Sequence, residues 1–384
     1  MYARNILAVG NFFLAVSATL VNYTLLSYLS SFVSRTHIGF AIAGGGAVAV
    51  IAFFFLPRIV ARHGAQRLAL LLVFAEMMLL FAVALTPGTI ASALFVILAL
   101  SFQPLVFYEL DLLLEATVNN EGTTGRVRTF FLTGWNIGAF VAPLIIGMLL
   151  ADIDNYTHVF LAAAVALTPF VILFSARRLP EGEILQPARV RDTLLHIMRD
   201  RDLAAVTAGH LILYLFYVWA PLYVPAFLHT VIGVPWSTLG WMFAVMLIPY
   251  IVIEYPAGWL ADRALGDKEL MMAGFLVAGS ALAAVSFITT SAAPLIILAV
   301  LVATRVGAAL IEAMTEGHFF RRVSEKDIVS VSIFRGVWPL ANAVAPLIGS
   351  VILLFGSYRL FFLLTGGFVL IAGAISTLLI RDFR

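Results

Sequence analysis

The stretch that decides the fold reads Gly258-Trp259-Leu260-Ala261-Asp262-Arg263-Ala264-Leu265-Gly266-Asp267-Lys268. It joins two long apolar runs and carries its charges between Asp262 and Lys268. A charged connection this short returns the chain to the same side of a membrane. The sequence therefore predicts a membrane protein whose helices cross the bilayer one after another.

The composition of the whole chain supports this prediction. Its 384 residues are 62% hydrophobic and 11% charged, whereas soluble domains have about 25% charged residues. A soluble surface needs more charge than this chain holds, so lipid must surround most of its surface. Twelve crossings of roughly 20 apolar residues each, together with their short loops, would use nearly the whole chain, which leaves no room for a separate catalytic domain.

Apolar runs divide the chain into twelve predicted membrane spans, and Gly258 ends the eighth. The longest polar stretch, from Arg177 to Asp202, falls at the midpoint and predicts a cytoplasmic linker. The predicted domains are an N-terminal six-helix half over 1–176, a linker over 177–202 and a C-terminal six-helix half over 203–384. The predicted spans are 6–33, 38–57, 67–86, 90–114, 129–151, 157–176, 203–229, 236–259, 269–289, 293–316, 330–354 and 358–380.

An internal repeat supports two related halves. The sequence Val-Ala-Pro-Leu-Ile occurs at 141–145 and again 203 residues later, at 344–348. The same offset pairs Glu109 in the fourth span with Glu312 in the tenth. Parallel halves related by an axis along the membrane normal occur in secondary transporters. The predicted fold class is therefore an all-α membrane protein with twelve transmembrane helices in two pseudo-symmetric six-helix bundles.

The basic residues predict the orientation, because cytoplasmic loops carry an excess of Lys and Arg. With the N-terminus inside, 19 of the 23 Lys and Arg residues fall in cytoplasmic segments. We therefore expect a multi-pass integral membrane protein with both termini in the cytoplasm. The short loops and tails favour a bacterial inner membrane, while an organellar membrane stays open as an alternative.

The pattern Gly-x-Leu-Ala-Asp-Arg, followed by Gly and a cation, resembles the signature loop of the major facilitator superfamily. In that family the loop lies between helices 2 and 3 and recurs between helices 8 and 9. The first loop of this chain departs from the pattern, with Pro57 and Ala61 where the family has Gly and Asp, although Arg62 and Arg67 remain. The resemblance implies a transporter that works by alternating access around a site lined by spans 1, 4, 7 and 10.

The resemblance also implies a cytoplasmic gate at the second loop. In the family, charges of this loop form a latch that closes the cytoplasmic side in one conformation. We carry this role over to Asp262 and Arg263, with Gly258 and Lys268 completing the matching positions. The same role is in doubt for the degraded first loop.

Ionisable residues in the tenth span are candidate functional groups, because charge in the hydrocarbon costs at least ~2.5–3.5 kcal/mol per residue on insertion scales. Arg305, Glu312 and Glu316 share one helical face. With the span starting at Pro294, Arg305 lies about 17 Å and Glu312 about 27 Å down at ~1.5 Å per residue. Arg305 is thus predicted to anchor substrate and the two carboxylates to carry protons. The alternative is that Arg305 and an acidic neighbour only hold helices together.

The fourth span contributes a second polar group. Gln103 precedes Pro104, a residue that frees a backbone carbonyl and can kink the helix. Glu109 and Asp111 follow, and because they are two residues apart they cannot share one face. We predict Gln103 as a cavity residue and both acids as proton-coupling candidates, against the alternative of an ion pair at the cytoplasmic helix end.

Spans 1, 7 and 11 supply uncharged polar and aromatic side chains. Such a wall suits an amphipathic organic solute, whereas the alternative is an interfacial belt or helix packing. The predicted cavity residues from these spans are Asn22, Tyr23, Tyr214, Tyr217, Trp338 and Asn342.

Missing motifs exclude several function classes. The chain has no cysteine, which excludes disulfides and thiol chemistry. It contains no phosphate loop for ATP and no metalloprotease motif. The basic residues follow membrane topology, which argues against nucleic-acid binding. We expect no catalytic residue, no metal and no cofactor, and therefore no enzyme.

The predicted function is a secondary active transporter that moves a small organic solute, with proton coupling or coupling to another ion. The expected partners are the solute, the proton and the lipid bilayer, and we expect a monomer. An uncoupled facilitator would equilibrate the solute without accumulating it. A solute sensor with a transporter fold would bind the solute without moving it. The sequence leaves the substrate and the direction of transport open.

Overall fold

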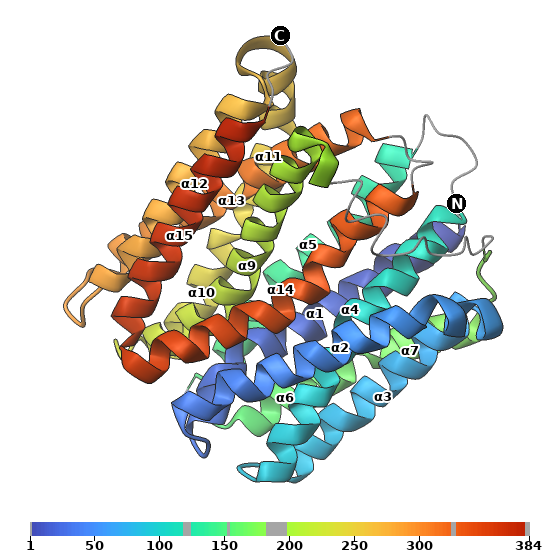
Figure 1. Cartoon of the computed structure of the whole chain (residues 1–384). Helices are drawn as coiled ribbons and strands as arrows, with labels where there is room; N and C mark the ends of the chain where they lie inside the picture. The colour runs from blue at the N-terminus through green and yellow to red at the C-terminus, as the bar shows by residue number, and fades with distance from the viewer. Residues whose placement is uncertain (1, 118–123, 152–153, 182–197, 324–327, 381–384) are drawn as a thin grey trace. The chain divides into compact units, whose positions relative to one another are not determined.

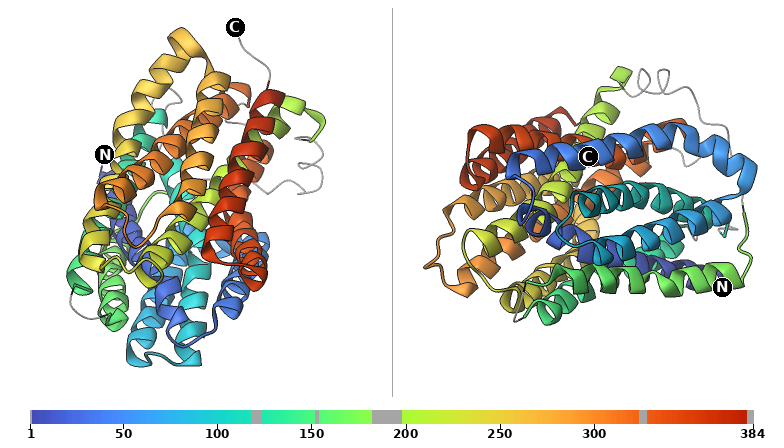
Figure 2. Two further views of the ribbon diagram at one scale, coloured as in Figure 1. Left: turned by 90° about the vertical axis from the view of Figure 1, so that its left-hand side faces the viewer. Right: turned by 90° about the horizontal axis from the view of Figure 1, so that it is seen from below.

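The computed structural model describes residues 2–117, 124–151, 154–181, 198–323 and 328–380. In this part of the chain every regular element is a helix, as the ribbons of Figures 1 and 2 show. Twelve helical spans are long and apolar enough to cross a membrane. The predicted all-α fold class with twelve transmembrane helices is confirmed.

Two of the twelve spans are interrupted near their middle. Span six divides at Leu167 and span eight at Leu247, and in each case a proline, Pro169 or Pro249, stands in the first turn of the helix that follows. Proline lacks the N–H that a helix interior needs but is tolerated in the first turn. The helices are α1 (Tyr2–Ser30), α2 (Arg35–His63), α3 (Ala65–Leu85), α4 (Ile90–Glu115), α5 (Thr124–Leu149), α6 (Tyr156–Ala166), α7 (Thr168–Ala176), α9 (Arg201–Thr230), α10 (Trp236–Met246), α11 (Ile248–Leu260), the π-helical turn η2 (Ala261–Leu265), α12 (Asp267–Ala284), the 3-10 turn η3 (Val285–Phe287), α13 (Pro294–Arg322), α14 (Ile328–Phe355) and α15 (Tyr358–Leu379).

The helices form two compact units, each described here by itself. Unit 1 comprises Met1–Gln186 and Leu228–Ala244, and unit 2 comprises Pro187–Phe227 and Val245–Arg384. Unit 1 therefore takes in the end of α9 and most of α10 in addition to α1 to α7. The domains predicted at 1–176 and 203–384 follow the internal repeat and remain a prediction. Most of the predicted linker, 182–197, lies outside the described residues.

Helix α1 is the buried centre of unit 1, and α5 lies directly against it. A Cβ atom at Gly134 of α5 would lie 2.3 Å from the backbone oxygen of Ala8, and one at Gly138 would lie 2.4 Å from that of Phe12. Small residues let two membrane helices approach closely. The glycines of the fifth span thus allow the α1–α5 contact.

In unit 2, helix α12 packs closely against α13 and α15. A Cβ atom at Gly307 of α13 would lie 2.3 Å from the nitrogen of Ala278, and one at Gly366 of α15 would lie 2.3 Å from that of Ala283. Both faces of α12 therefore depend on glycine in the partner helix.

Large apolar side chains stay exposed along the helices. Phe55, Leu71 and Phe355 keep 52%, 63% and 87% of their surface accessible. Apolar exposure on this scale would promote aggregation of a soluble protein, but hydrocarbon tails cover such side chains in a bilayer. The packing thus agrees with the twelve predicted spans.

The loops before α3 and α12 have the same backbone geometry. Gly64 has φ 84° and Gly266 has φ 85°, a region that favours glycine. Two residues after each glycine, a side chain binds the end of the last helix in its half of the sequence. Gln66 Nε2 donates to the carbonyl oxygens of Phe174 and Arg177, at 2.7 and 2.5 Å. Lys268 Nζ donates to the carbonyl oxygen of Ile380 at 3.0 Å.

Candidate functional site

Three polar side chains of unit 1, one each from α1, α3 and α4, form a hydrogen-bonded chain. Glu76 is fully buried, and its Oε1 accepts a hydrogen bond from Gln103 Nε2 at 3.3 Å. Gln103 Oε1 accepts in turn from Asn22 Nδ2 at 3.4 Å. Gln103 is 8% exposed and Asn22 is half-buried. The predicted cavity residues Asn22 and Gln103 are thus brought together, with Glu76 behind them.

Glu109 lies closer to the end of α4 and is also fully buried. Among the described residues, neither of its carboxylate oxygens has a hydrogen-bond partner. Its neighbour Asp111 is 9% exposed, and Glu115 at the helix end is exposed. A buried carboxylate without a partner is costly, so this position suits a neutral carboxyl group that binds and releases a proton.

In unit 2, Arg305 lies in the middle of α13 and is 3% exposed. Its guanidinium carbon is 5.4 Å from the ring centroid of Phe216 on α9. A cation over an aromatic face gains electrostatic energy without losing its charge. Arg305 therefore keeps a positive charge deep inside its unit, as a site for an anionic group requires.

Two tyrosines connect Arg305 with the carboxylate further along α13. The Tyr217 hydroxyl donates to Glu312 Oε2 at 2.5 Å. The Tyr250 ring lies 6.2 Å from the Tyr217 ring, and its hydroxyl interacts electrostatically with both Arg305 and Glu312. Of these four, sequence reasoning missed Tyr250. It lies in α11 directly after Pro249, and its spacing from the other three gave no signal.

The other predicted cavity residues have separate surroundings. Tyr214 packs edge-to-face on Tyr217 at 5.7 Å and lies 6.3 Å from the Trp338 ring, which extends the aromatic wall in unit 2. Asn342 donates to the carbonyl oxygen of Trp338 in its own helix at 3.3 Å. In unit 1, Tyr23 is 5% exposed and its ring is 5.2 Å from that of Phe243.

Among the residues predicted for the gate whose side chains the structure describes, Arg263 and Lys268 contact different groups. Arg263 is exposed and lies over the Trp259 ring at 5.0 Å, whereas Lys268 binds the end of α15. Gly258 lies within α11, with open space where a Cβ would be. The side chain of Asp262 lies outside the described residues, so its predicted role stays a prediction.

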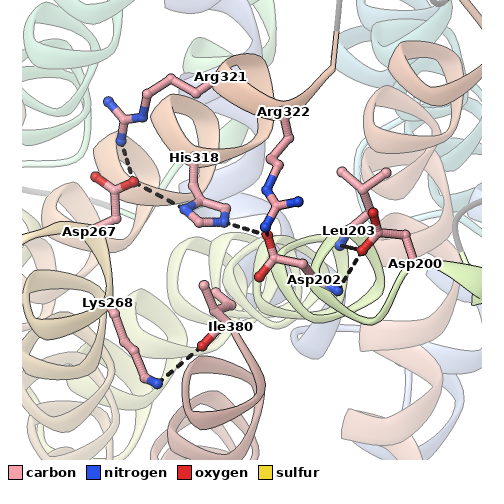
Figure 3. Close-up of polar contacts among 9 residues, drawn as sticks. All are labelled: Asp200, Asp202, Leu203, Asp267, Lys268, His318, Arg321, Arg322 and Ile380. Atoms are coloured by element: carbon pink, nitrogen blue, oxygen red, sulfur yellow. Dashed lines mark hydrogen bonds and ion pairs between the residues drawn. The ribbon is translucent and has the colours of Figure 1, made fainter. Parts of the chain in front are cut away.

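An ion network that sequence reasoning missed lies beside this loop (Figure 3). His318 Nε2 is 2.9 Å from Asp202 Oδ2, and His318 Nδ1 is 3.1 Å from Asp267 Oδ2. Arg322 lies 2.8 Å from Asp202, and Arg321 pairs with Asp267. An ionised carboxylate can only accept hydrogen bonds, so the ring binds both carboxylates as an imidazolium.

This network joins the start of α9, the start of α12 and the end of α13. Glu316, two residues before His318, is half-buried and interacts with other groups. The charged residues at the end of the tenth span could have indicated an ion network there. They could not have indicated Asp202 as a partner, because it lies 116 residues from His318 in the sequence. The second signature loop thus contributes Asp267 to the network.

Unit 1 contains a second pair that sequence reasoning missed. His229 Nε2 is 2.9 Å from Asp154 Oδ2, and the His229 ring lies 4.8 Å from that of Trp236. Trp236 Nε1 donates to the Tyr156 hydroxyl at 3.4 Å. Through these contacts the end of α9 and the start of α10 pack against the start of α6. Among the described residues, no group of three His, Cys, Asp or Glu could hold a metal ion.

Comparisons with known proteins find one family model and several solved structures that are similar to this chain. Residues 224–383 match the family model described as Major Facilitator Superfamily. No relative among curated protein sequences matches the chain.

Among solved structures, the fold is similar to that of a bacterial homologue of the human lysosomal transporter Spinster. Its inward-facing, occupied crystal structure aligns with a TM-score of 0.75 at 15% identity, covering 98% of this chain and 96% of that chain. The inward-facing, unoccupied crystal structure aligns with a TM-score of 0.71, with the same identity and coverage.

Proposed function

We propose that this chain is a transporter of the major facilitator superfamily that moves a small organic solute across the membrane by alternating access, coupled to the proton. The match of residues 224–383 to the family model and the similarity of the fold to that of a solved transporter support this proposal. A transporter of this family implies a small-molecule substrate and a lipid bilayer around the helices. We further propose the coupling ion, the chemical class of the substrate and the roles of single residues.

The observation that carries proton coupling is the burial of Glu109. Its carboxyl group is inaccessible and, within the described chain, has no hydrogen-bond donor or cation beside it. An ionised group there would be uncompensated, so the group holds a proton until water or another partner reaches it. Exposure to alternating sides of the membrane supplies such a change, and a proton then crosses with each cycle.

Glu312 is the proposed partner of Glu109 in the second half of the sequence. It occupies the repeat position of Glu109 and accepts a short hydrogen bond from Tyr217. The hydrogen bond from Tyr217 fixes the position of the Glu312 carboxylate on α13. Asp111 and Glu316 remain further candidates on the same helices.

The proposed substrate carries a carboxylate or another group rich in acceptors. Arg305 offers a fixed positive charge near the middle of its span, and guanidinium groups bind carboxylates with two parallel hydrogen bonds. The aromatic side chains Tyr214, Tyr217 and Trp338 lie on the same unit and suit the apolar part of an amphipathic solute. Asn22, Tyr23, Gln103 and Asn342 are the proposed polar contacts.

The remaining parts of the proposal concern location and gating. The distribution of Lys and Arg supports cytoplasmic termini in a bacterial inner membrane. Asp262 and Arg263 are proposed to close the cytoplasmic side in the outward-open state, together with Gly258 and Lys268. We propose that the transporter acts as a monomer, because each half has its own polar centre.

The test starts with ligand binding to detergent-purified protein. A thermal-shift panel of organic acids, sugars, nucleosides, peptides and amphipathic drugs is run at about pH 5.5 and about pH 7.5, because a ligand that binds only the folded state raises its stability. We expect a stabilising organic acid whose shift depends on pH. A hit is then reconstituted in proteoliposomes, and its accumulation is measured with and without a pH gradient.

Two results would contradict the proposal. Accumulation that is indifferent to the pH gradient would identify a facilitator or another coupling ion. Stabilisation by a ligand that is bound but never enters the vesicles would identify a solute sensor.

A further inference from the structure

Glu76 is a buried acid that the proposed transport cycle does not use. It lies in the middle of α3, which packs against α2, α4, α6 and α7. Its side chain is fully buried, and Gln103 Nε2 donates to its Oε1 at 3.3 Å. Among the described residues, Oε2 has no hydrogen-bond partner.

No cation compensates Glu76 in the described part of the chain, where its one polar contact is Gln103. Its own helix has Arg67, nine residues and about 14 Å away along the axis at ~1.5 Å per residue. On the packed helices the titratable groups lie towards the ends, or on the half of α4 that follows Gln103. They are Arg35, His37, Arg58, Arg62, His63, Tyr108, Glu109, Asp111, Glu115, Tyr156 and His158.

A carboxyl group in these surroundings is stable as the neutral acid, because an isolated buried charge is far more costly than a buried neutral group. The neutral acid has one O–H donor in addition to its acceptors. That donor needs an acceptor, and Gln103 is the neighbour that can offer one. The protonation state of Glu76 therefore decides whether Gln103 turns its NH2 group or its oxygen towards Glu76.

Gln103 can meet either demand by turning its amide group. With its NH2 towards Glu76, as observed, it serves a carboxylate acceptor and turns its oxygen to Asn22. With its oxygen towards Glu76, it accepts the O–H of the neutral acid and turns its NH2 to Asn22. The two amide atoms have nearly the same shape, so the turn needs no repacking.

Asn22 is the half-buried end of this chain of three residues, while the other two are buried. In the observed arrangement Asn22 donates to Gln103 at 3.4 Å. After the turn it must accept from Gln103, and it then presents its NH2 group to its exposed side. Asn22 is also a predicted cavity residue, so the proton on Glu76 changes the polar group that a solute would meet.

We propose that Glu76 is a proton-binding site separate from Glu109 and Glu312, and that its occupancy sets the orientation of the Gln103 and Asn22 amides. The ligand is the proton, and its bound form is the neutral carboxyl group of Glu76. The site needs no substrate to be detected, so it can be tested even if the assignments of Glu109 and Glu312 fail.

The test is infrared difference spectroscopy of the purified full-length protein during a pH titration. A protonated carboxyl group has a carbonyl stretching band that ionised carboxylates lack. We expect the wild type to lose one band of a buried carboxyl group on alkaline titration, and Glu76→Gln to lack that band at every pH. Glu109→Gln should keep it. Glu115→Gln, at the exposed end of the neighbouring helix, is the matched control and should also keep it.

A second variant keeps the proposal falsifiable if Glu76→Gln does not fold. Gln103→Leu removes the observed hydrogen-bond partner, so the Glu76 band should remain and shift to higher frequency. Asn22→Leu should leave the band in place with a smaller shift. A Glu76 that never titrates would show no pH-dependent loss of its band, in the wild type or in Gln103→Leu.

Two outcomes would overturn the proposal. One is a spectrum of Glu76→Gln that equals the wild type over the whole titration. The other is a cation site: thermal stabilisation of the wild type by sodium chloride but not by choline chloride, lost in Glu76→Gln, would mean that Oε2 binds an alkali ion in place of a proton.

Discussion

In unit 1, one buried acid contacts an amide and another has no hydrogen-bond partner among the described residues, whereas an acid of unit 2 contacts a tyrosine. Glu76 and Glu109 are fully buried in unit 1, and within the described chain neither has a cation beside it. In unit 2, Glu312 accepts from Tyr217, and Arg305 lies deep in the same helix. The sequence repeat thus places two helices with equivalent acids in different electrostatic surroundings.

The different surroundings of the acids are consistent with different roles for the two halves in the proposed transport cycle. The described contacts of Glu76 and Glu109 include no charged partner, whereas Glu312 accepts a hydrogen bond from a tyrosine hydroxyl. In the proposed function, Glu109 carries the proton in the first half and Arg305 binds an anion in the second. Four experiments test this contrast between the units.

The largest expected effect concerns the imidazolium of unit 2. His318→Gln removes the positive charge between Asp202 and Asp267, and breaking a buried charge pair costs about 3–5 kcal/mol. We expect a marked fall in the thermal unfolding temperature in detergent. His37→Gln, at an exposed site in unit 1, is the control and should leave the temperature unchanged. Equal stability of both variants would mean that the network contributes no net stability.

The next effect concerns substrate binding at Arg305. Arg305→Ala should weaken an anionic ligand by roughly 10- to 100-fold, because hydrogen bonds to charged groups contribute about 1.5–3 kcal/mol. Arg305→Lys keeps the charge but loses the planar fork, so it should be intermediate. The measurement is a ligand titration followed by thermal shift. The exposed Arg359→Ala is the control. Unchanged affinity in Arg305→Ala would remove the reason to expect an anionic substrate.

Loss of Glu109 or Glu312 should reduce proton-coupled transport, whereas loss of the exposed Glu115 should not. Glu109→Gln and Glu312→Gln should each lower pH-driven accumulation by at least about tenfold, which corresponds to about 1.4 kcal/mol. Exchange of labelled for unlabelled substrate should persist, since it needs no net proton movement. Glu115→Gln is the control in the same vesicles. If both variants accumulate substrate as the wild type does, the proton-coupling roles of these two residues are wrong.

The smallest effect compares the two loops. Gln66 makes hydrogen bonds to two carbonyl oxygens and accepts one from the nitrogen of Leu179, whereas Lys268 makes one bond to Ile380. A net hydrogen bond contributes about 0.5–1.5 kcal/mol. Gln66→Leu should therefore lower the unfolding temperature more than Lys268→Met. The opposite order would show that the charge of Lys268 outweighs the number of bonds made by Gln66.

Much of the fold was predictable because lipid imposes simple rules on sequence. Runs of about 20 apolar residues predict the spans, and all twelve predicted spans correspond to observed ones. Proline interruptions at Leu167 and Leu247 were not predicted, since proline within an apolar run does not by itself tell a kink from a break. The division into compact units was also not predicted, because the end of α9 and most of α10 join unit 1 through packing.

The sequence predicted which residue types form the candidate site. It did not predict which side chains contact one another there. The spacing of Arg305 and Glu312 on one helix follows from 3.6 residues per turn. Their links to Tyr217 and Tyr250 depend on how three helices pack, and no local spacing encodes this. The same applies to His318, whose two carboxylate partners lie 116 and 51 residues away.

The sequence by itself determined that this chain is a twelve-helix membrane protein with a repeated plan, because hydrophobic length, charge distribution and motif spacing are local properties. Only the tertiary structure decided which buried acids have partners. Glu76 and Glu109 have the same side chain as Glu312, yet their surroundings differ because helices far apart in the sequence bring an amide to one, no donor to another and a tyrosine to the third. The free energy of a buried charge depends on its neighbours in space, so tertiary packing sets the chemistry of these acids.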